Sequence, residues 1–265
     1  MNDKTVDKQN VGEEALNERT NERTNERTNE RTNERTNERT GEFLNLDCME
    51  GMKRYPDKYF DLAICDPPYG GVTQGGYMTN QMGGGVAKNR NDYHLSLWQC
   101  ERPGKEYFDE LMRVSKNQII WGGNYYASLL PDSQCWIVWD KEKPEGISFA
   151  DCELAWTSFN LASRIFKFAW HGMIQGDMKH KQQKIHPTEK PIRLYEWLLD
   201  RFAHEGDTIL DTHVGSASSL IACHNKGFEY VGFEIDPVYY KAAKERLDQE
   251  TAQMSIFDFI ERTTT

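Results

Sequence analysis

The sequence lacks three features that would each point to a particular class of protein. It has no apolar run near the roughly 20 residues that a membrane helix requires. Its six cysteines stand singly, with no Cys-x-x-Cys pair, which argues against a zinc ribbon or a disulfide framework. It also lacks net positive charge, since 32 Lys and Arg face 42 Asp and Glu and the formal charge is −10. Any contact with a polyanion must therefore come from a local basic patch.

The first residues, MNDKTVDKQN, are polar and contain no apolar segment of the kind that directs secretion. We therefore expect a cytoplasmic protein that makes no contact with a membrane and keeps its cysteines reduced, part of them in the core. Residues 17–40 repeat Asn-Glu-Arg-Thr six times without one apolar side chain. Because the repeat has no apolar face to pack, residues 1–40 are predicted to be a disordered arm and 41–265 a single domain.

From residue 41 onward, short apolar segments alternate with amphipathic ones. The expected strands cover 43–47, 60–65, 118–121, 135–139, 153–156, 208–211 and 229–234, and the expected helices 50–54, 106–114, 192–203, 218–225 and 237–250. Strands that are apolar on both faces and alternate with helices are typical of a doubly wound, mostly parallel sheet, a Rossmann-like α/β fold. Ligands of such sheets bind beyond the carboxyl ends of the strands, so the residues that follow each strand are the functional candidates.

The first candidate segment, Asp66-Pro67-Pro68-Tyr69, follows the expected strand 60–65. Two consecutive prolines remove two backbone donors and keep the chain extended, which leaves a carboxylate, free carbonyls and an aromatic ring together. The Asp66 carboxylate and the Pro67 carbonyl suit the two N–H groups of an exocyclic amine, and Tyr69 can stack on the ring that carries it. The alternative is an ordinary proline turn with an Asp in solvent.

This segment and its place in the chain resemble the S-adenosylmethionine-dependent DNA amino-methyltransferases. Their hallmark is a (D/N/S)PP(Y/F/W) tetrapeptide at a strand end, present here as DPPY. The stretch 186–191, HPTEKP, resembles the family's HPTxKP segment, and 211–218 resembles its D-x-F-x-G-S-G cofactor turn. The catalytic motif precedes the cofactor turn, as in the family's permuted beta arrangement. The similarity covers roughly residues 42–250.

The cofactor turn departs from the family pattern at two positions. His213 replaces the usual Phe, and Ala217 replaces the last Gly. Gly215 remains and permits a close approach of the backbone to a ligand, whereas Ala217 costs one methyl group of room. Asp211 would accept from the amino group of the cofactor, and the backbone donors that follow it, Ser216 included, would hold its carboxylate. His213 is expected to pack behind the cofactor rather than to act in catalysis.

The resemblance implies further cofactor contacts outside this turn. Glu234 ends the next strand and would accept both ribose hydroxyls, with Asp236 as its rival. Asp47 would contact the adenine of the cofactor, with the backbone of Cys48 beside it, unless Asp47 only caps a helix.

Two residues of the HPTEKP segment, Thr188 and Lys190, would reach the carboxylate of the cofactor's methionine. The alternative for Lys190 is a surface position in a proline-bounded turn. The chemistry needs no metal ion, and the sequence shows no cluster of metal ligands.

Two segments are candidates for contact with double-stranded DNA. The first is the Gly-rich stretch 70–104. The second is 157–188, which contains five basic residues and one acidic residue, with aromatic residues between them. Contacts to DNA phosphates need a basic patch of this kind. The target amine is buried in base stacking, so the nucleotide must be flipped into the pocket. A homodimer and a cognate restriction enzyme are further partners that the resemblance suggests.

The sequence thus predicts a DNA methyltransferase that acts on adenine N6 with S-adenosylmethionine as cofactor. Asp rather than Ser or Asn at position 66 favours adenine. Methylation of cytosine N4, of RNA or of a protein amide is an alternative within the same class. A catalytically idle DNA-binding module with a decayed cofactor turn is the alternative from a different class.

Overall fold

The computed structural model describes residues 41–70, 101–146, 150–171, 174–176, 178–179, 184–186 and 188–264. Side chains are described as far as residue 252, apart from that of His171. The chain divides into two units between Thr40 and Gly41, and the described residues all belong to the second. The expected arm, residues 1–40, and most of the expected loop, residues 70–104, lie outside the described residues.

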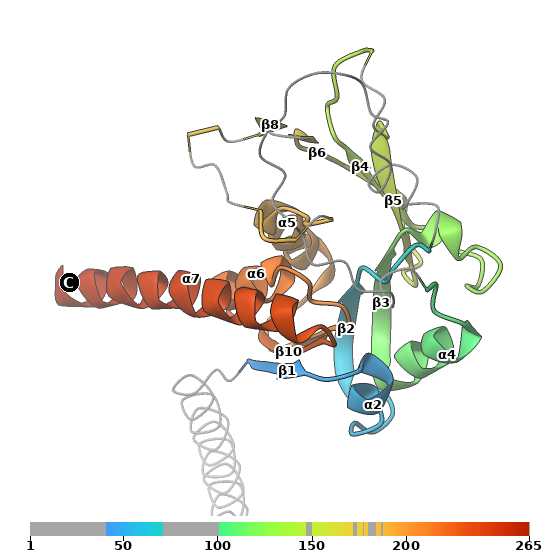
Figure 1. Ribbon diagram of the computed structural model, residues 1–265, viewed down its shortest axis with the longest axis horizontal. Coiled ribbons are helices and arrows are strands. Elements are labelled where there is room, and N and C mark those ends of the chain that lie inside the picture. The colour runs from blue at the N-terminus through green and yellow to red at the C-terminus, as the bar shows by residue number, and fades with distance from the viewer. Residues whose placement is uncertain are drawn as a thin grey trace, which may run out of the picture. The chain divides into compact units, whose positions relative to one another are not determined.

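An eight-stranded sheet forms the centre of this unit (Figure 1). Its strands lie in the order β1 (Glu42–Asn45), β10 (Glu229–Glu234), β9 (Thr208–Asp211), β2 (Phe60–Cys65), β3 (Ser115–Trp121), β5 (Cys152–Thr157), β4 (Trp136–Asp140) and β6 (Arg164–Lys167). The five strands from β1 to β3 are parallel, whereas β5 is antiparallel to both of its neighbours. The last pair, β4 and β6, is parallel again. The predicted mostly parallel sheet is therefore confirmed.

Helices cover both faces of the sheet (Figure 1). Along β2, Leu62 and Ile64 pack in one core with residues of α5, α6 and α7, while Ala63 and Cys65 pack in the other with residues of α2 and α4. This alternation follows from the two-residue period of a strand, and it confirms the predicted double winding. The helices are α2 (Cys48–Met52), α4 (Lys105–Val114), α5 (Ile192–Phe202), α6 (Ser218–Lys226) and α7 (Pro237–Thr264).

Each strand and helix expected from the sequence is present, with small shifts of its ends. The main difference in length is α7, which runs to Thr264 instead of ending near residue 250. No Gly or Pro occurs between Val238 and Thr264, so nothing in that stretch breaks the helix. The remaining elements, β6, β7 (Trp170–His171), β8 (Ile174–Gln175) and the short helix η2 (Gly123–Tyr125), were not anticipated.

The core contains the side chains that the strand patterns placed there. Trp121, Trp139 and Trp156, which all lie in strands, are buried, whereas Trp136 at the start of β4 is half-buried. The five cysteines within the described residues are free thiols, and Cys65, Cys135 and Cys223 are buried. Among the described helices none is long and apolar enough to span a membrane.

Candidate active site

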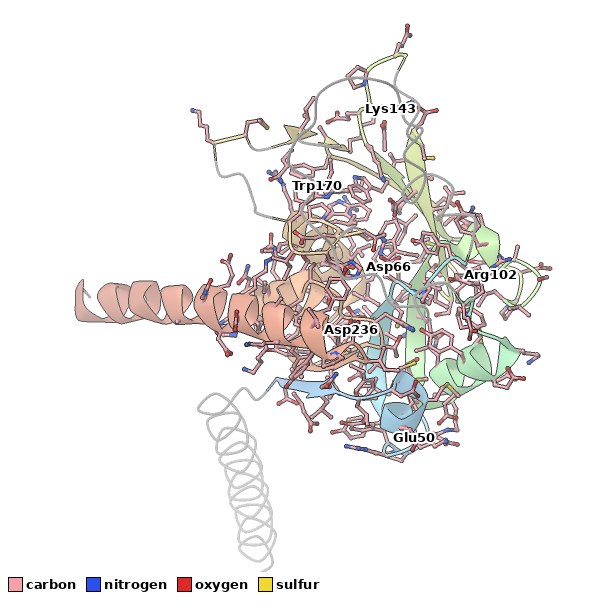
Figure 2. All side chains as sticks on the ribbon, viewed as in Figure 1. Glu50, Asp66, Arg102, Lys143, Trp170 and Asp236 are labelled. Atoms are coloured by element: carbon pink, nitrogen blue, oxygen red, sulfur yellow. The ribbon has the colours of Figure 1, made fainter. Side chains whose placement is uncertain are left out.

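The parallel strands bring the predicted motifs to one edge of the sheet. β2 leads directly into Asp66, and its neighbour β9 ends at Asp211. On the far side of β9, β10 ends at Glu234, and β1 leads toward Asp47. Figure 2 shows two residues of this edge, Asp66 after β2 and Asp236 after β10. Acidic side chains from distant parts of the sequence therefore share the edge where ligands of such sheets bind.

The Asp66–Tyr69 segment is held by hydrogen bonds from two tyrosine hydroxyls, that of its own Tyr69 and that of Tyr126. The Tyr69 hydroxyl donates to Asp66 Oδ1 at 2.6 Å. The Tyr126 hydroxyl lies 2.6 Å from the Pro68 carbonyl oxygen and 3.0 Å from that of Pro67. Burial, followed by the charge of Asp66, raises the pKa of Tyr69 well above its usual value, so the phenol remains a hydrogen-bond donor. The segment is thus a rigid support for one carboxylate and two carbonyls, and the alternative of a proline turn in solvent is wrong.

Gly122, the first residue after β3, makes room for the Tyr69 ring. It has a positive φ of 70°, and a Cβ atom there would lie 2.1 Å from the Tyr69 ring. A side chain at this position would therefore be strained and would also collide with Tyr69. The turn that Gly122 opens carries Tyr125, whose ring stacks on Tyr69 with centroids 4.9 Å apart and an angle of 21°. Tyr125 thus backs the ring whose hydroxyl contacts the Asp66 carboxylate.

Lys190 lies at the catalytic motif and is fully enclosed. Its side chain is 3% exposed, so the alternative of a surface lysine is wrong. The ammonium nitrogen forms an ion pair with Asp66 Oδ2, lies 3.2 Å from Glu153 Oε2 and lies 3.3 Å from the Tyr69 hydroxyl. Burial alone would lower the pKa of Lys190, but the carboxylates of Asp66 and Glu153 more than offset this and raise it. Lys190 is therefore a permanently charged neighbour of Asp66.

The cofactor turn is organised around the buried carboxylate of Asp211. Its Oδ1 accepts from the backbone N–H of His213 at 2.9 Å, and its Oδ2 accepts from the Ser219 hydroxyl. Burial is the main cause that raises the pKa of Asp211 to about 7, and the nearby charges of Asp66 and Glu234 add to it. A bound cation would relieve this cost, which makes the position suited to an ammonium group.

The backbone of the cofactor turn takes two left-handed conformations. Gly215 has φ of 56° and suits that region without strain. Ala217 is buried and has a φ of 65°, a region that costs an alanine backbone strain. Replacement of the family's Gly by Ala217 therefore strains the backbone, whereas the sequence predicts a loss of space for the ligand. Ser216 is buried, and its carbonyl oxygen accepts from Arg246 of α7 at 2.8 Å.

Glu234 and its rival Asp236 have different tasks in this structure. Glu234 accepts from the backbone N–H of Gly215 at Oε2 and of Asp236 at Oε1, both at 2.9 Å. Asp236 Oδ1 accepts from the N–H groups of Val238 and Tyr239, at 2.8 and 3.2 Å, and so caps the start of α7. Burial raises the pKa of Glu234. Glu234 is thus fixed against the cofactor turn, while Asp236 stabilises a helix end.

Asp47 also caps a helix, which was the alternative considered for it. Its Oδ1 accepts from the N–H groups of Met49 and Glu50, at 2.9 and 3.2 Å, at the start of α2. Cys48 is the first residue of that helix, and burial is the main cause that raises the pKa of its thiol to about 12. A thiol with such a pKa stays protonated, so Cys48 offers its backbone rather than a thiolate.

The two histidines near the cofactor turn are neutral. Burial lowers the pKa of His213 to about 4, and its Nδ1 lies 2.9 Å from the Thr212 hydroxyl. Burial is also the main cause that lowers the pKa of His186 to about 4. The exposed residue Thr188 places its hydroxyl 3.1 Å from His186 Nδ1, and a Cβ atom at Gly215 would lie 3.6 Å from the His186 ring. Thr188 thus lies on the side of the cofactor turn, whereas Lys190 points to Asp66.

Sequence reasoning did not find Glu153, Tyr125 or Tyr126 as residues of the site. Glu153 lies near the start of β5, and because β5 is antiparallel to β3 its first residues lie at the carboxyl edge of the parallel strands. The sequence predicts functional residues only after strands, whereas Glu153 lies at the start of one. The Gly-Gly pair at 122–123, directly after an apolar strand, is the local signal that could have indicated the tyrosine turn.

Of the two predicted DNA-facing segments, only 157–188 is described in substantial part. Phe166 and Trp170 are buried in the core, and Phe159 and Phe168 are half-buried and pack against it. Arg164 and Lys167, at the ends of β6, remain exposed. Arg164 and Lys167 thus face solvent while Phe166, between them, faces inward.

Known proteins resemble the part of the chain that carries the HPTEKP segment and the cofactor turn. Residues 138–245 match the family model N6_N4_Mtase, described as DNA methylase. Over 71 residues the chain is 41% identical to type II methyltransferase M.HpaI of Haemophilus parainfluenzae. The aligned stretch covers 27% of this chain and 23% of that protein. Over 69 residues it is 35% identical to the Escherichia coli (strain K12) protein named "Putative methylase YubD". This second aligned stretch covers 26% of this chain and 30% of that protein. The chain therefore matches less than a third of the length of these two relatives.

The fold has a counterpart among solved structures. PvuII DNA methyltransferase, described as cytosine-N4-specific, superposes with a TM-score of 0.51 at 13% identity, over 80% of this chain and 92% of that one. At this identity the likeness shows the fold alone, which is the Rossmann-like methyltransferase fold predicted above. Together with the family model over residues 138–245, this likeness shows that the chain resembles the DNA methylases in that part of its sequence and in its fold.

Proposed function

We propose that the protein transfers the methyl group of S-adenosylmethionine to the exocyclic N6 amine of adenine in DNA. The observation that carries this proposal is the position of Asp66. Its carboxylate follows β2, and the cofactor-turn acid Asp211 ends the adjacent parallel strand β9. An amine acceptor and a cation acceptor at neighbouring strand ends are what a methyl transfer between two bound molecules needs, because most of its catalysis comes from positioning.

The residues at the carboxyl edge fit S-adenosylmethionine in charge and in backbone conformation. Asp211, whose pKa is raised to about 7, would pair with the ammonium group of the methionine moiety. Glu234 would accept the ribose hydroxyls with the lone pairs that remain on its two oxygens, which the N–H groups of Gly215 and Asp236 hold in place. The left-handed Gly215 would let the backbone approach the ligand closely.

The other expected cofactor contacts surround this turn. Asp47 and the backbone of Cys48, at the start of α2, would lie beside the adenine of the cofactor. His213 would pack behind the cofactor, since it is neutral and in edge contact with the Tyr107 ring. Thr188 and the backbone of Ser216 would border the methionine carboxylate. When bound, the cofactor supplies an electrophilic methyl group on a sulfonium centre.

The Asp66–Tyr69 segment would hold the target amine. Asp66 and the carbonyl oxygen of Pro67 would accept its two N–H groups, which favours a lone pair localised on nitrogen and directed at the methyl group. Pro68 keeps the segment extended, and Tyr69 would stack on the target base. The amine must lose one proton after methylation, and Asp66 is the group placed to receive it. Lys190 is charged and so serves to neutralise Asp66 rather than to accept a proton.

The substrate that fits this pocket is a base flipped out of a DNA duplex, because a stacked base does not expose its amine to a recessed carboxylate. Arg164 and Lys167 on β6 would contact phosphates on the way to the pocket. Asp at position 66 favours adenine N6 over cytosine N4.

A nucleoside analysis tests this proposal. Unmethylated genomic DNA is incubated with the protein and S-adenosylmethionine, digested to nucleosides and examined by mass spectrometry. We expect N6-methyldeoxyadenosine to accumulate with time. N4-methyldeoxycytidine as the product would overturn the specificity, and the absence of any methylated nucleoside would overturn the proposed activity.

A further inference from the structure

Four charged side chains form a cluster beside the catalytic motif that the proposed mechanism uses only in part. We call Asp66, Lys190, Glu153 and Lys141 the charge cluster. Lys190 lies between two carboxylates, paired with Asp66 Oδ2 and 3.2 Å from Glu153 Oε2. Lys141 pairs with the other oxygen of Glu153. With two acids and two lysines the cluster is neutral as a whole.

Both oxygens of Asp66 are engaged by neighbouring side chains. The Tyr69 hydroxyl donates to Oδ1, and the Lys190 ammonium occupies Oδ2. A target amine that is to donate to Asp66 therefore competes with Lys190 for the same carboxylate. Lys190 has little freedom to leave, because a buried ammonium without a partner is strongly unfavourable.

Glu153 is a second carboxylate partner for Lys190, and one of its oxygens still has no hydrogen bond with the described residues. Its Oε2 is shielded from solvent and forms no hydrogen bond with the described residues, although it lies within ion-pair distance of Lys190. The carboxylate as a whole is kept charged, since Lys190 and Lys141 more than offset the effect of burial and lower the pKa of Glu153 to about 2. A small movement of Lys190 toward Oε2 would complete a hydrogen bond there.

The surroundings of Glu153 hold it in place. Glu153 lies on β5, which pairs with β4 along five residues, and Trp139 of β4 is its direct partner. Lys141, just beyond β4, packs over the Trp139 ring at 4.9 Å while it pairs with Glu153. Glu153 is therefore a fixed acceptor, and Lys190, at the end of a longer and more flexible side chain, is the group that can shift.

We propose that Glu153 is a positioning residue that takes over the Lys190 ammonium when Asp66 engages the target amine. This inference rests on the proposed function of Asp66 and adds a residue outside the motifs of the family. It predicts that the charge of Glu153 affects the methyl-transfer step through Lys190 and leaves cofactor binding unchanged.

The test compares Glu153→Gln with a matched control, Asp61→Asn. Asp61 lies near the opposite end of β2, has the same 24% side-chain exposure as Glu153 and also pairs with a lysine, Lys116. We expect Glu153→Gln to lower kcat for methyl transfer to unmethylated DNA by about 10- to 100-fold, the effect of misplacing a reacting group. The dissociation constant for S-adenosylmethionine should stay within about twofold. Asp61→Asn should leave kcat unchanged.

A second variant separates the charge of Glu153 from a merely structural role. Glu153→Asp keeps the charge with a shorter side chain and should recover part of the kcat that Glu153→Gln loses. Thermal melts of all variants show whether the loss follows unfolding. A Glu153→Gln enzyme with wild-type kcat, or a Glu153→Asp enzyme no better than Glu153→Gln, would overturn the inference. A wild-type protein that transfers no methyl group would overturn the proposed function itself.

Discussion

At the scale of single residues, the site depends on buried carboxylates whose ionisation is costly until a ligand arrives. Asp211 is the clearest case, because it is buried among other acids and its pKa is raised to about 7. Such a group holds a proton in the folded state at pH values where the unfolded chain has lost it. Asp211 therefore contributes a growing loss of stability to the folded protein as the pH rises from about 4 to about 7.

Asp211→Asn tests this electrostatic cost. Asn imitates the protonated acid, so the variant should melt near the wild-type temperature at pH 5 and above it at pH 8. The full shift in pKa corresponds to at most about 4 kcal/mol at 1.4 kcal/mol per pH unit. The same variant should bind S-adenosylmethionine at least tenfold more weakly at pH 8 in calorimetry. A melting temperature at pH 8 equal to that of the wild type would contradict the account.

At the scale of elements, α7 stabilises the cofactor turn through one side chain. Arg246 is 11% exposed and donates to the Ser216 carbonyl oxygen at 2.8 Å and to the Ser218 hydroxyl at 3.1 Å. It also lies 3.4 Å from Oε1 of Glu189, which is buried in the HPTEKP segment. Three segments that form the site are thus joined through Arg246.

Arg246→Met should therefore destabilise the fold by about 3 kcal/mol, because it takes from the buried Glu189 carboxylate the cation with which it pairs. For a domain of this size the melting temperature should fall by roughly 6–12 °C. Arg201→Met, on the exposed side of α5, is the matched control and should change it by less than about 2 °C. Equal melting temperatures for the two variants would show that Arg246 has no such role.

Local sequence patterns predict the helices and strands well, but they predict the direction in which the strands pair less completely. The strands β2, β9 and β10 were evident from apolar runs, and their parallel packing followed from the helices between them. The antiparallel direction of β5 depends on which neighbours it meets, and no local pattern encodes that. For this reason Asp66, Asp211 and Glu234 were found at strand ends, while Glu153, at a strand start, was not. Lys190 was expected at the cofactor, but its partner Glu153 became evident only from the fold.

At the scale of the whole molecule, the stability of the chain should come from residues 41–265. The buried apolar side chains among the described residues lie between Phe43 and Leu247. A protein that begins at Gly41 should therefore melt within about 2 °C of the full chain. A protein that begins at Cys48 is the control and should be unstable, because it lacks β1, which pairs with β10. A loss of more than about 5 °C on removal of residues 1–40 would contradict the predicted domain division.

The central claim, that Asp66 acts on the target amine and not on the cofactor, is tested most directly by tritiated-methyl transfer to DNA with Asp66→Ala. We expect incorporation to fall to the background level while calorimetry shows cofactor affinity within a few fold of the wild type. Methyl transfer by Asp66→Ala at a rate near that of the wild type would contradict the account.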